Sequence, residues 1–359
     1  MNRTATGRAF GQLVSVTIVT HNSASFVDSC LDSVFSGQRG PLEVIVVDNA
    51  SGDGTRERLR RYEPRARVFY NGRNTGFAAG QNQAIAAGRG DWVLTLNPDV
   101  RLEPHFIDRL VEAGGRDPRV GTVCGKLRRW LPESDGPAVE RIDSTGIYFT
   151  PEFRHFDRGW NEPDDGRYDR SEYVFGACAA AALYRREMIR DTALADGFFD
   201  PDFFTYREDA DVAWRAQLLG WRCLYVPEAV AYHVRRLAPD RRRSAPAFLR
   251  MHSVKNRFLM RIKNVTWELY RRHWMRATAR DLMVLAGCLL AEPHSLAGFW
   301  HLARALPRAL EKRRHLMRRR RVADNDLAQW FADQPVSRPF EAEIAGARRQ
   351  HVWASPQRA

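Results

Sequence analysis

The first 115 residues alternate between short apolar runs and segments with helical periodicity. Val14–Thr20 and Leu42–Asp48 are rich in β-branched residues, as buried strands are, and Ser25–Phe35 between them has apolar residues at helical spacing. The alternation continues with a strand over Ala66–Tyr70, a helix over Phe77–Ala87, a strand over Asp91–Leu96 and a helix over Pro104–Ala113. This order predicts a Rossmann-like α/β fold with a mostly parallel central sheet, whose ligands sit beyond the carboxyl ends of the strands.

Residues 128–173 interrupt this alternation. Pro, Gly, Asp and aromatic residues mix there without a period, so the sequence predicts only a long, loop-rich insertion. Order returns over 177–233. The expected elements there are a small-residue strand (ACAAAALY), a helix from Arg186, an aromatic loop, a helix from Glu208 and a strand that ends near Val226.

After Pro246 the pattern is helical and basic as far as Arg321. The segment Arg235–Arg321 contains 23 Lys and Arg against 5 Asp and Glu, whereas the whole chain of 359 residues carries a net charge of +13. The positive charge is therefore concentrated in this segment. We predict an α/β domain over 1–240, a basic helical region over 241–335 and a flexible tail over 336–359.

A concentration of positive charge predicts an anionic partner, such as a phospholipid surface, a nucleic acid or a phosphate-bearing substrate. Leu, Phe, Trp and Met residues interleave with the cations, which is typical of amphipathic helices at a membrane surface. The alternative is a charged helix face that is simply solvated.

Cysteine usage and hydropathy favour a reduced, cytoplasmic chain. The five cysteines are widely separated and form no C-x-x-C pair. Residues 1–12 are polar, so we expect no signal peptide. The longest apolar run, Leu282–Ala291, is shorter than the roughly 20 residues that cross a bilayer, so we expect no membrane span.

Polar residues follow the first two strands. Thr20 and Asn22 end one strand and Asp48 ends the next, and because parallel strands end at the same sheet edge, we expect these side chains to be neighbours. A carboxylate at such an edge can accept the imide N–H of a uracil or thymine ring. Turn formation and helix capping are the alternative explanation for residues 51–55, but they explain Asp48 less well.

Residues 74–82 (NTGFAAGQN) open a helix with amides and small side chains, and a helix N-terminus favours phosphate or polar ligands. The glycines do not fit G-x-G-x-x-G, and the chain contains no G-x-x-x-x-G-K-[ST]. A nicotinamide-binding fingerprint and a P-loop are therefore both disfavoured.

Two acidic groups could carry chemistry. Asp99 follows a strand directly after Pro98, where a single carboxylate can hold Mg²⁺ or Mn²⁺ together with substrate phosphates. Glu208, Asp209 and Asp211 begin a helix, where acidic residues also suit the helix dipole. Three of them exceed what capping requires, and the aromatic residues before them could form a wall for a sugar, so one carboxylate could act as a general base.

Seven segments between Val14 and His233 then occur in a fixed order: VTIVTHN, VVDNASGDGT, NTGFAAGQNQAI, LNPDV, GACAAAALYRREM, FFDPDFFTYREDADVAWRAQLLGW and AYHV. In sequence and order they resemble the family 2 glycosyltransferases of GT-A fold, and among these the rhamnosyltransferase-like branch. The resemblance implies a role for eleven residues. The nucleotide-sugar donor would contact Thr20, Asn22, Asp48, Asn74, Asn82 and Asn97, the metal would be held by Asp99 and His233, and catalysis would rest on Asp209 with Glu208 and Asp211 beside it.

The resemblance also implies a mechanism. Asp209 would deprotonate an acceptor hydroxyl, which displaces the nucleoside diphosphate with inversion. Many members have Asp-x-Asp where this chain has Asn97-Pro98-Asp99, so one metal carboxylate is missing. If the donor is dTDP-β-L-rhamnose, the new linkage is α.

Several alternatives stay open. The same fold could use a UDP-hexose or UDP-N-acetylhexosamine donor, and the basic helices alone would suit a nucleic-acid-binding protein, although that would leave the carboxylate loops unexplained. The expected partners are a nucleotide-sugar donor, a glycan or lipid-linked glycan acceptor of cell-surface polysaccharide synthesis, and the anionic inner face of the cell membrane.

Overall fold

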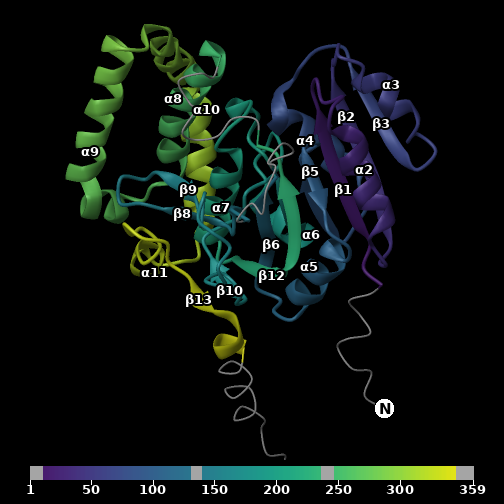
Figure 1. Cartoon of the computed structure of the whole chain (residues 1–359). Helices are drawn as coiled ribbons and strands as arrows, with labels where there is room; N and C mark the ends of the chain where they lie inside the picture. The colour runs from purple at the N-terminus through teal and green to yellow at the C-terminus, as the bar shows by residue number, and fades with distance from the viewer. Residues whose placement is uncertain (1–10, 131–139, 236–245, 345–359) are drawn as a thin grey trace, which may run out of the picture.

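The computed structural model describes residues 11–130, 140–235 and 246–344, and places a large central sheet beside a group of long helices (Figure 1). The sheet has eleven strands, nine of them in the order β13-β10-β12-β6-β11-β4-β1-β2-β3, while β5 pairs with β12 and β7 with β6. Its strands are β1 (Val14–Thr20), β2 (Leu42–Asn49), β3 (Ala66–Asn71), β4 (Trp92–Leu96), β5 (Val100–Leu102), β6 (Val120–Arg129), β7 (Ile142–Ser144), β10 (Glu172–Val174), β11 (Ala181–Arg185), β12 (Arg222–His233) and β13 (Arg338–Pro339).

The N-terminal half of the sheet is parallel, as predicted. β1 lies between β2 and β4, and the register of β1 on β2 places Thr20 opposite Asp48. Every residue of β1 is buried, because helices cover both faces of the sheet. These helices are α2 (Val27–Ser36), α3 (Thr55–Arg60), α4 (Gly76–Ala87) and α5 (Phe106–Gly115). The expected neighbourhood of Thr20 and Asp48 is confirmed.

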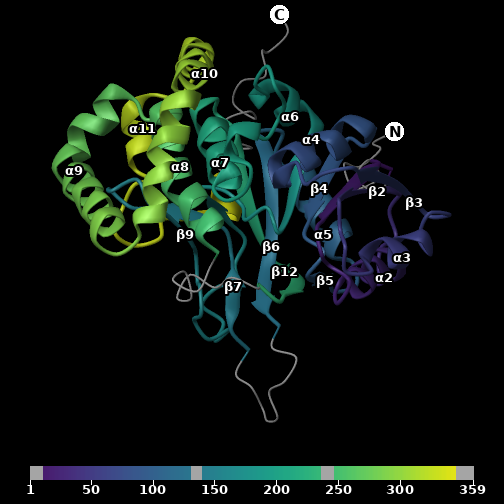
Figure 2. The ribbon, with the colours of Figure 1, turned by 90° about the horizontal axis from the view of Figure 1, so that it is seen from above.

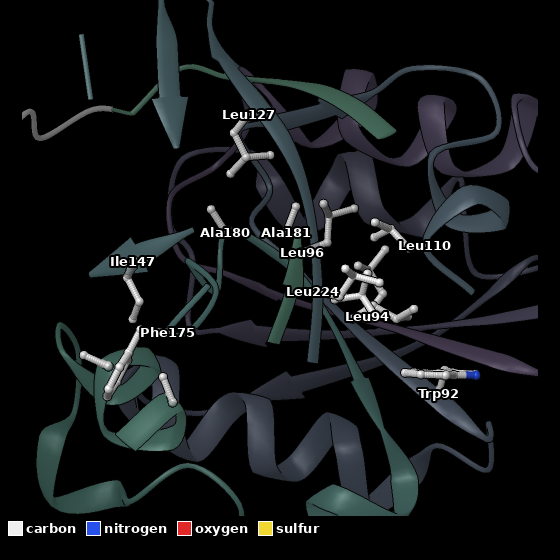
Figure 3. Close-up of a cluster of buried hydrophobic side chains, with 14 of the residues drawn as sticks. Trp92, Leu94, Leu96, Leu110, Leu127, Ile147, Phe175, Ala180, Ala181 and Leu224 are labelled. Atoms are coloured by element: carbon white, nitrogen blue, oxygen red, sulfur yellow. The ribbon is translucent and has the colours of Figure 1, made fainter. Parts of the chain in front are cut away.

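The C-terminal half of the sheet is mixed. β11 runs antiparallel to both β4 and β6, and β12 is parallel to β6. Figure 3 shows Leu94 and Leu96 of β4 gathered with Leu224 of β12 against Leu110 of α5. One large apolar cluster therefore joins the parallel and mixed halves.

Strand β12 is longer than predicted. The sequence indicated an end near Val226, but the strand continues to His233 after a register shift between Val226 and Val230. Pro227 and Glu228 lie in this shift, and a bulge of this kind re-aims the strand without ending it. Its final residue, His233, pairs with Val100 of β5, directly after Asp99.

The insertion at 128–173 is more ordered than its pattern indicated. From residue 140 onward it supplies β7, β10 and a separate hairpin of β8 (Ile147–Phe149) and β9 (His155–Asp157). Phe149 lies within 6 Å of the ring centres of Phe175, Trp214 and Phe331, so the hairpin is anchored in the core. Residues 131–139 lie outside the described part of the chain.

The basic region forms three long helices, α8 (Ala247–Asn264), α9 (Trp267–Leu290) and α10 (Ala297–Arg319). Shorter helices are α6 (Arg186–Thr192), α7 (Glu208–Leu218) and α11 (Asp324–Ala328). α8 packs on α7 and on α10, whereas α9 lies at the outer edge of the molecule (Figure 2). None of the helices within the described ranges combines the length and the apolar character needed to cross a bilayer.

The first residues of the predicted C-terminal tail pair with the central sheet. Residues Arg338–Pro339 pair with β10, and Phe340 is buried against Tyr173 at 5.4 Å between ring centres. The pairing ties this part of the predicted tail to the sheet, and the flexible tail over 336–359 stays a prediction. The rest of the predicted tail, 345–359, and the predicted boundary at residue 240 fall outside the described residues.

Candidate active site

A cavity of about 770 Å³ lies between the sheet and the C-terminal helices. On the sheet side it is lined by Asn97, Asp99 and His233, and at the start of α7 by Glu208 and Asp209. Asn97 and Asp99 follow the carboxyl end of β4, where an open α/β sheet binds its ligands. The structure thus brings five of the predicted site residues together.

Asp99 and His233 form the predicted metal pair. The Nε2 of His233 lies 3.5 Å from Oδ1 of Asp99, and its Nδ1 lies 2.8 Å from Oδ2 of Asp143. Asp143 is fully buried and also accepts two hydrogen bonds from Arg235. A carboxylate behind a histidine orients the ring and leaves its other nitrogen available for a metal.

This arrangement fits a divalent metal. One carboxylate oxygen and one imidazole nitrogen point toward the same place, and the histidine already has its orienting carboxylate. Burial lowers the pKa of His233, but Asp143 and Asp99 outweigh burial and raise it to about 9. The excess of negative charge that holds a proton on this ring would equally attract a cation.

A second group of carboxylates, formed by Asp196, Asp200 and Asp202, surrounds a lysine. The Nζ of Lys312 lies 2.6 Å from Asp196, 2.7 Å from Asp200 and 3.0 Å from Asp202. Despite burial, which raises it, Lys263 and Lys312 lower the pKa of Asp200 below its usual range. The ammonium group of Lys312 takes the central position, so this cluster is a salt-bridge network.

Asp209 and Glu208 face the cavity from the first turn of α7. The carboxylate of Asp209 accepts hydrogen bonds from the backbone N–H groups of Ala210 and Ala179, at 2.7 and 3.3 Å. Desolvation, followed by the charge of Asp157, nevertheless raises the pKa of Asp209. A carboxylate with a raised pKa is a stronger base, as proton removal from a hydroxyl requires.

The environment of Glu208 disfavours a charged carboxylate more strongly than that of Asp209. Burial, and then the adjacent Asp209, raise its pKa to about 8. Its Oε2 is buried and makes no hydrogen bond with the described residues. Glu208 is therefore protonated at neutral pH and lies where it can donate a hydrogen bond to a ligand in the cavity.

Asp211 does not line the cavity. It is fully buried and pairs with Arg215 and Lys263, both at 2.9 Å, while Asn264 donates to it at 2.8 Å. Its carboxylate fixes α7 to α8. Asp211 was predicted to act beside Asp209. Its contacts show that it holds α7 in place and does not line the cavity.

The C-terminal helices also hold the loop that enters α7. Phe204, Tyr206 and Arg207 have φ values of 64°, 68° and 72°, a left-handed conformation that is costly for residues other than glycine. Asn256 of α8 donates to the carbonyl oxygens of Phe203, Thr205 and Tyr206 at 2.8 to 2.9 Å. The conformation that presents Glu208 and Asp209 thus depends on α8.

The predicted nucleoside residues lie at the edge formed by β1 and β2. Thr20 donates to Asp48 at 3.0 Å, and Arg56 binds the other carboxylate oxygen at 2.8 Å. Asn22 accepts from the backbone N–H of Gly52 at 2.9 Å, which joins the two loops. Sequence reasoning missed Arg56, which lies on α3 and orients the buried Asp48.

The predicted asparagines have unequal positions. Asn97 lines the cavity, whereas the side-chain oxygen of Asn74 accepts a hydrogen bond from the backbone N–H of Gly76, the first residue of α4, at 2.8 Å. Asn82 binds the backbone of Phe199 with both its amide nitrogen and its oxygen, at 2.7 and 2.9 Å. It therefore holds the aromatic loop in place and does not line the described cavity.

Sequence reasoning missed most of the cavity wall. Asp157 and Arg235, 2.8 Å apart, lie beside Asp209 and the metal pair, and Trp160 stacks under Arg235 at 4.7 Å. Asp143, Asp157 and Trp160 belong to the insertion that has no periodic pattern. Their signal in the sequence was only the density of acidic and aromatic residues.

Comparisons with known proteins agree with this geometry. Residues 15–192 match the sequence profile of Glycosyl transferase family 2. The chain is 30% identical over 242 residues to an N-acetylglucosaminyl-diphospho-decaprenol L-rhamnosyltransferase of Mycobacterium tuberculosis, covering 62% of this chain and 76% of that protein. It is 26% identical over 359 residues to the succinoglycan biosynthesis protein ExoO of Rhizobium meliloti, covering 96% of each.

The fold also matches a solved glycosyltransferase. A crystal structure of GalNAc-T7 with UDP, GalNAc and Mn²⁺ superposes with a TM-score of 0.54 at 17% identity, covering 70% of this chain and 48% of that chain. The mixed sheet with its acidic edge defines a nucleotide-sugar transferase of GT-A fold. The chain belongs to the family 2 glycosyltransferases, and within them it is similar to a rhamnosyltransferase.

Proposed function

We propose that this enzyme transfers a sugar, L-rhamnose from dTDP-β-L-rhamnose, with inversion to a lipid-linked glycan in cell-surface polysaccharide synthesis. The observation that carries the transferase chemistry is the meeting of Asp209 with the Asp99–His233 pair in one cavity. The rhamnosyl donor and the lipid-linked acceptor are supported by the similarity to the mycobacterial rhamnosyltransferase, whose name states both the sugar and a diphospho-decaprenol acceptor.

In the proposed mechanism, Asp209 takes the proton of the acceptor hydroxyl as that oxygen attacks the anomeric carbon. Its raised pKa and its helix-terminal hydrogen bonds suit a base that must be ionised yet basic. Glu208, protonated at neutral pH, orients the acceptor through its buried Oε2.

Asp99 and His233 would hold Mn²⁺ or Mg²⁺ at the donor end, with Asp143 fixing the ring of His233. A bound metal of this kind neutralises the charge that develops on the departing diphosphate. The single carboxylate and the imidazole nitrogen favour Mn²⁺, because Mg²⁺ is usually held by oxygen ligands.

Membrane contact is the second part of the proposal, at the cytoplasmic face. Helix α9 exposes one apolar stripe whose side chains show 39% to 68% of their surface. The stripe consists of Trp267, Trp274, Met275, Leu282, Leu285 and Leu289. Their spacing keeps them on one helix face, which can enter the headgroup region of a bilayer.

Fewer basic side chains are available for membrane contact than their number in residues 235–321 indicated. Lys263, Lys312 and Arg308 pair with Asp200 or Asp202, and Arg319 and Arg321 pair with Asp191. Much of the positive charge thus binds the catalytic domain. This inward pairing also weakens the alternative of a nucleic-acid-binding protein.

Donor screening tests the proposal. Thermal shift and hydrolysis are measured with dTDP-rhamnose, UDP-glucose, UDP-galactose, UDP-N-acetylglucosamine and GDP-mannose, each with and without Mn²⁺. We expect dTDP-rhamnose to respond most strongly, only with metal, and Asp99→Ala to abolish the metal effect. A response to a UDP-sugar alone would show that the donor is that UDP-sugar and not dTDP-rhamnose. If no donor gave a response, the proposed enzyme activity would be overturned.

A further inference from the structure

The cavity has charges of opposite sign at its two ends. The carboxylates of Asp99, Asp157 and Asp209 lie near the sheet edge and α7, beside the protonated Glu208. The opposite wall, formed by the β8–β9 turn, the residue before α7, and helices α8 and α9, carries five guanidinium groups. These belong to Arg154, Arg207, Arg250, Arg257 and Arg280.

Two arginines of this wall, Arg257 and Arg280, have N–H groups that the described residues satisfy only in part. Asp281 pairs with Arg257 at 3.3 Å but is shared with Arg261 at 2.6 Å. Arg250 has Glu292 at 3.7 Å. The Nε of Arg280 is buried and has no hydrogen-bond partner among the described residues. A buried guanidinium N–H without an acceptor is costly, and an anion in the cavity would supply one.

The pKa values of groups in this wall reflect the same excess of positive charge. The pKa of His155, in the cavity wall, is held well below its usual range by burial and then by Arg207 and Arg154. Burial, helped by the charges of Arg261 and Arg280 and opposed by Asp281, lowers the pKa of Arg257 to about 10.

We propose that Arg257 and Arg280, with the surrounding arginines of this wall, form a subsite for the diphosphate group of the acceptor. The inference rests on the proposed function and adds the residues that recognise the acceptor. Guanidinium groups bind phosphate oxygens in pairs, and several of them converge here in a partly closed cavity.

The position of the subsite agrees with a lipid-linked acceptor. Arg280 lies on α9, and Val284, one turn further along, also lines the cavity. Leu282 and Leu285 of the apolar stripe are near in sequence but lie on the opposite side of α9, because a helix turns by about 100° per residue. A diphosphate at Arg280 would have its sugar directed toward Asp209 in the same cavity, and its lipid chain would pass around α9 to reach the stripe.

A binding experiment separates this subsite from the donor site. Calorimetry measures the affinity of the intact protein for a short-chain alkyl diphosphate and, separately, for dTDP with Mn²⁺. We expect Arg280→Gln to weaken alkyl diphosphate binding about tenfold, the usual loss of one charge-assisted hydrogen bond, and to leave dTDP binding unchanged. Arg280→Lys should retain part of the affinity.

Arg271→Gln is the matched control. It removes the same charge from α9, but Arg271 is exposed, and its ion pair within the described ranges is with Glu268 of its own helix. We expect it to bind both ligands like the wild type. Circular dichroism checks that each variant folds, and Arg257→Lys gives a second, milder perturbation of the same wall.

Three results would overturn the subsite: no binding of alkyl diphosphate by the wild type, equal binding by wild type and Arg280→Gln, or a loss of dTDP affinity in Arg280→Gln. The last result would assign the arginines to the donor. A failure of the proposed function is a different outcome, because it appears in the donor screen and leaves the alkyl diphosphate measurement standing.

Discussion

At the scale of single residues, environment separates carboxylates that look equivalent in the sequence. Glu208, Asp209 and Asp211 occur within four positions, but a helix turns by about 100° per residue, so Asp211 points away from Asp209. Asp209 faces the cavity, and Asp211 faces Lys263 in the core. This division could have been predicted from helix geometry, but the partner Lys263, 52 residues further along the chain, could not.

Glu208 should make stability depend on pH. Its pKa is about 8 in the folded protein against 4.5 ordinarily, so the unfolded chain releases this proton first as the pH rises. Stability is therefore lost between about pH 4.5 and 8. Glu208→Gln removes this loss, and we expect its free energy of unfolding, relative to the wild type, to rise by at least about 1 kcal/mol from pH 5 to pH 8.

Urea unfolding at the two pH values measures this difference. Glu187→Gln is the control, since Glu187 stands in the first turn of α6 as Glu208 does in α7 but is exposed. A Glu208→Gln variant that follows the wild type at both pH values would contradict the assigned protonation of Glu208.

The pair of Asp99 and His233 shows which part of the candidate site could be predicted from the sequence. Asp99 was predicted from its place after a strand and His233 from the family resemblance, and the structure brings them to 3.5 Å. Asp143 was missed, because it lies in a segment whose residues follow no period. Its role depends on the tertiary contact with His233 and has no local signal.

At the scale of elements, the alternating strands and helices of the first half were predictable, since hydrophobic periodicity is strong there. The long β12 was not, because Pro227 and Glu228 imitate the end of a strand while tertiary pairing with β6 carries it onward. The same continuation places His233 in the site. The local sequence pattern indicated that the strand ends near Val226, whereas pairing with β6 continues it to His233 in the candidate site.

The link between α7 and α8 yields a prediction about stability. Lys263 is 1% exposed and pairs with Asp200 and Asp211. Lys263→Met removes one of the two cations that pair with each of these buried carboxylates and leaves Lys312 with Asp200 and Arg215 with Asp211. We expect the free energy of unfolding to fall by about 3 kcal/mol, the lower end of the usual cost of breaking a buried pair. Urea unfolding provides the measurement, with Arg271→Gln as a surface control that should change stability little. A loss below about 1 kcal/mol would refute the network's structural role.

At the scale of the whole molecule, the basic C-terminal region lines the cavity of the candidate active site. Its charge predicted an anionic partner outside the protein, but Lys263, Lys312 and Arg308 bind carboxylates of the loop that leads into α7. Composition shows how much charge a segment carries. Only the fold shows which way that charge faces.

The apolar stripe of α9 makes membrane association testable. Figures 1 and 2 place α9 at one edge of the molecule and β3 at the other. Trp274→Ala combined with Leu289→Ala removes apolar area that would enter the headgroup region, and we expect several-fold less protein to sediment with anionic vesicles. Tyr70→Ala, an exposed aromatic residue of β3, is the control. Equal sedimentation of all three proteins would exclude α9 as the contact surface.

We propose that this family 2 glycosyltransferase uses Asp209 to deprotonate its acceptor, and Asp209→Asn removes that base while keeping the size of the side chain. The measurement is the rate of sugar transfer beside the affinity for the donor, with Asp165→Asn, an exposed loop carboxylate, as the control. We predict that Asp209→Asn transfers about 10²- to 10⁴-fold more slowly while binding donor as the wild type does. Transfer by Asp209→Asn at a rate close to that of the control would contradict the assignment.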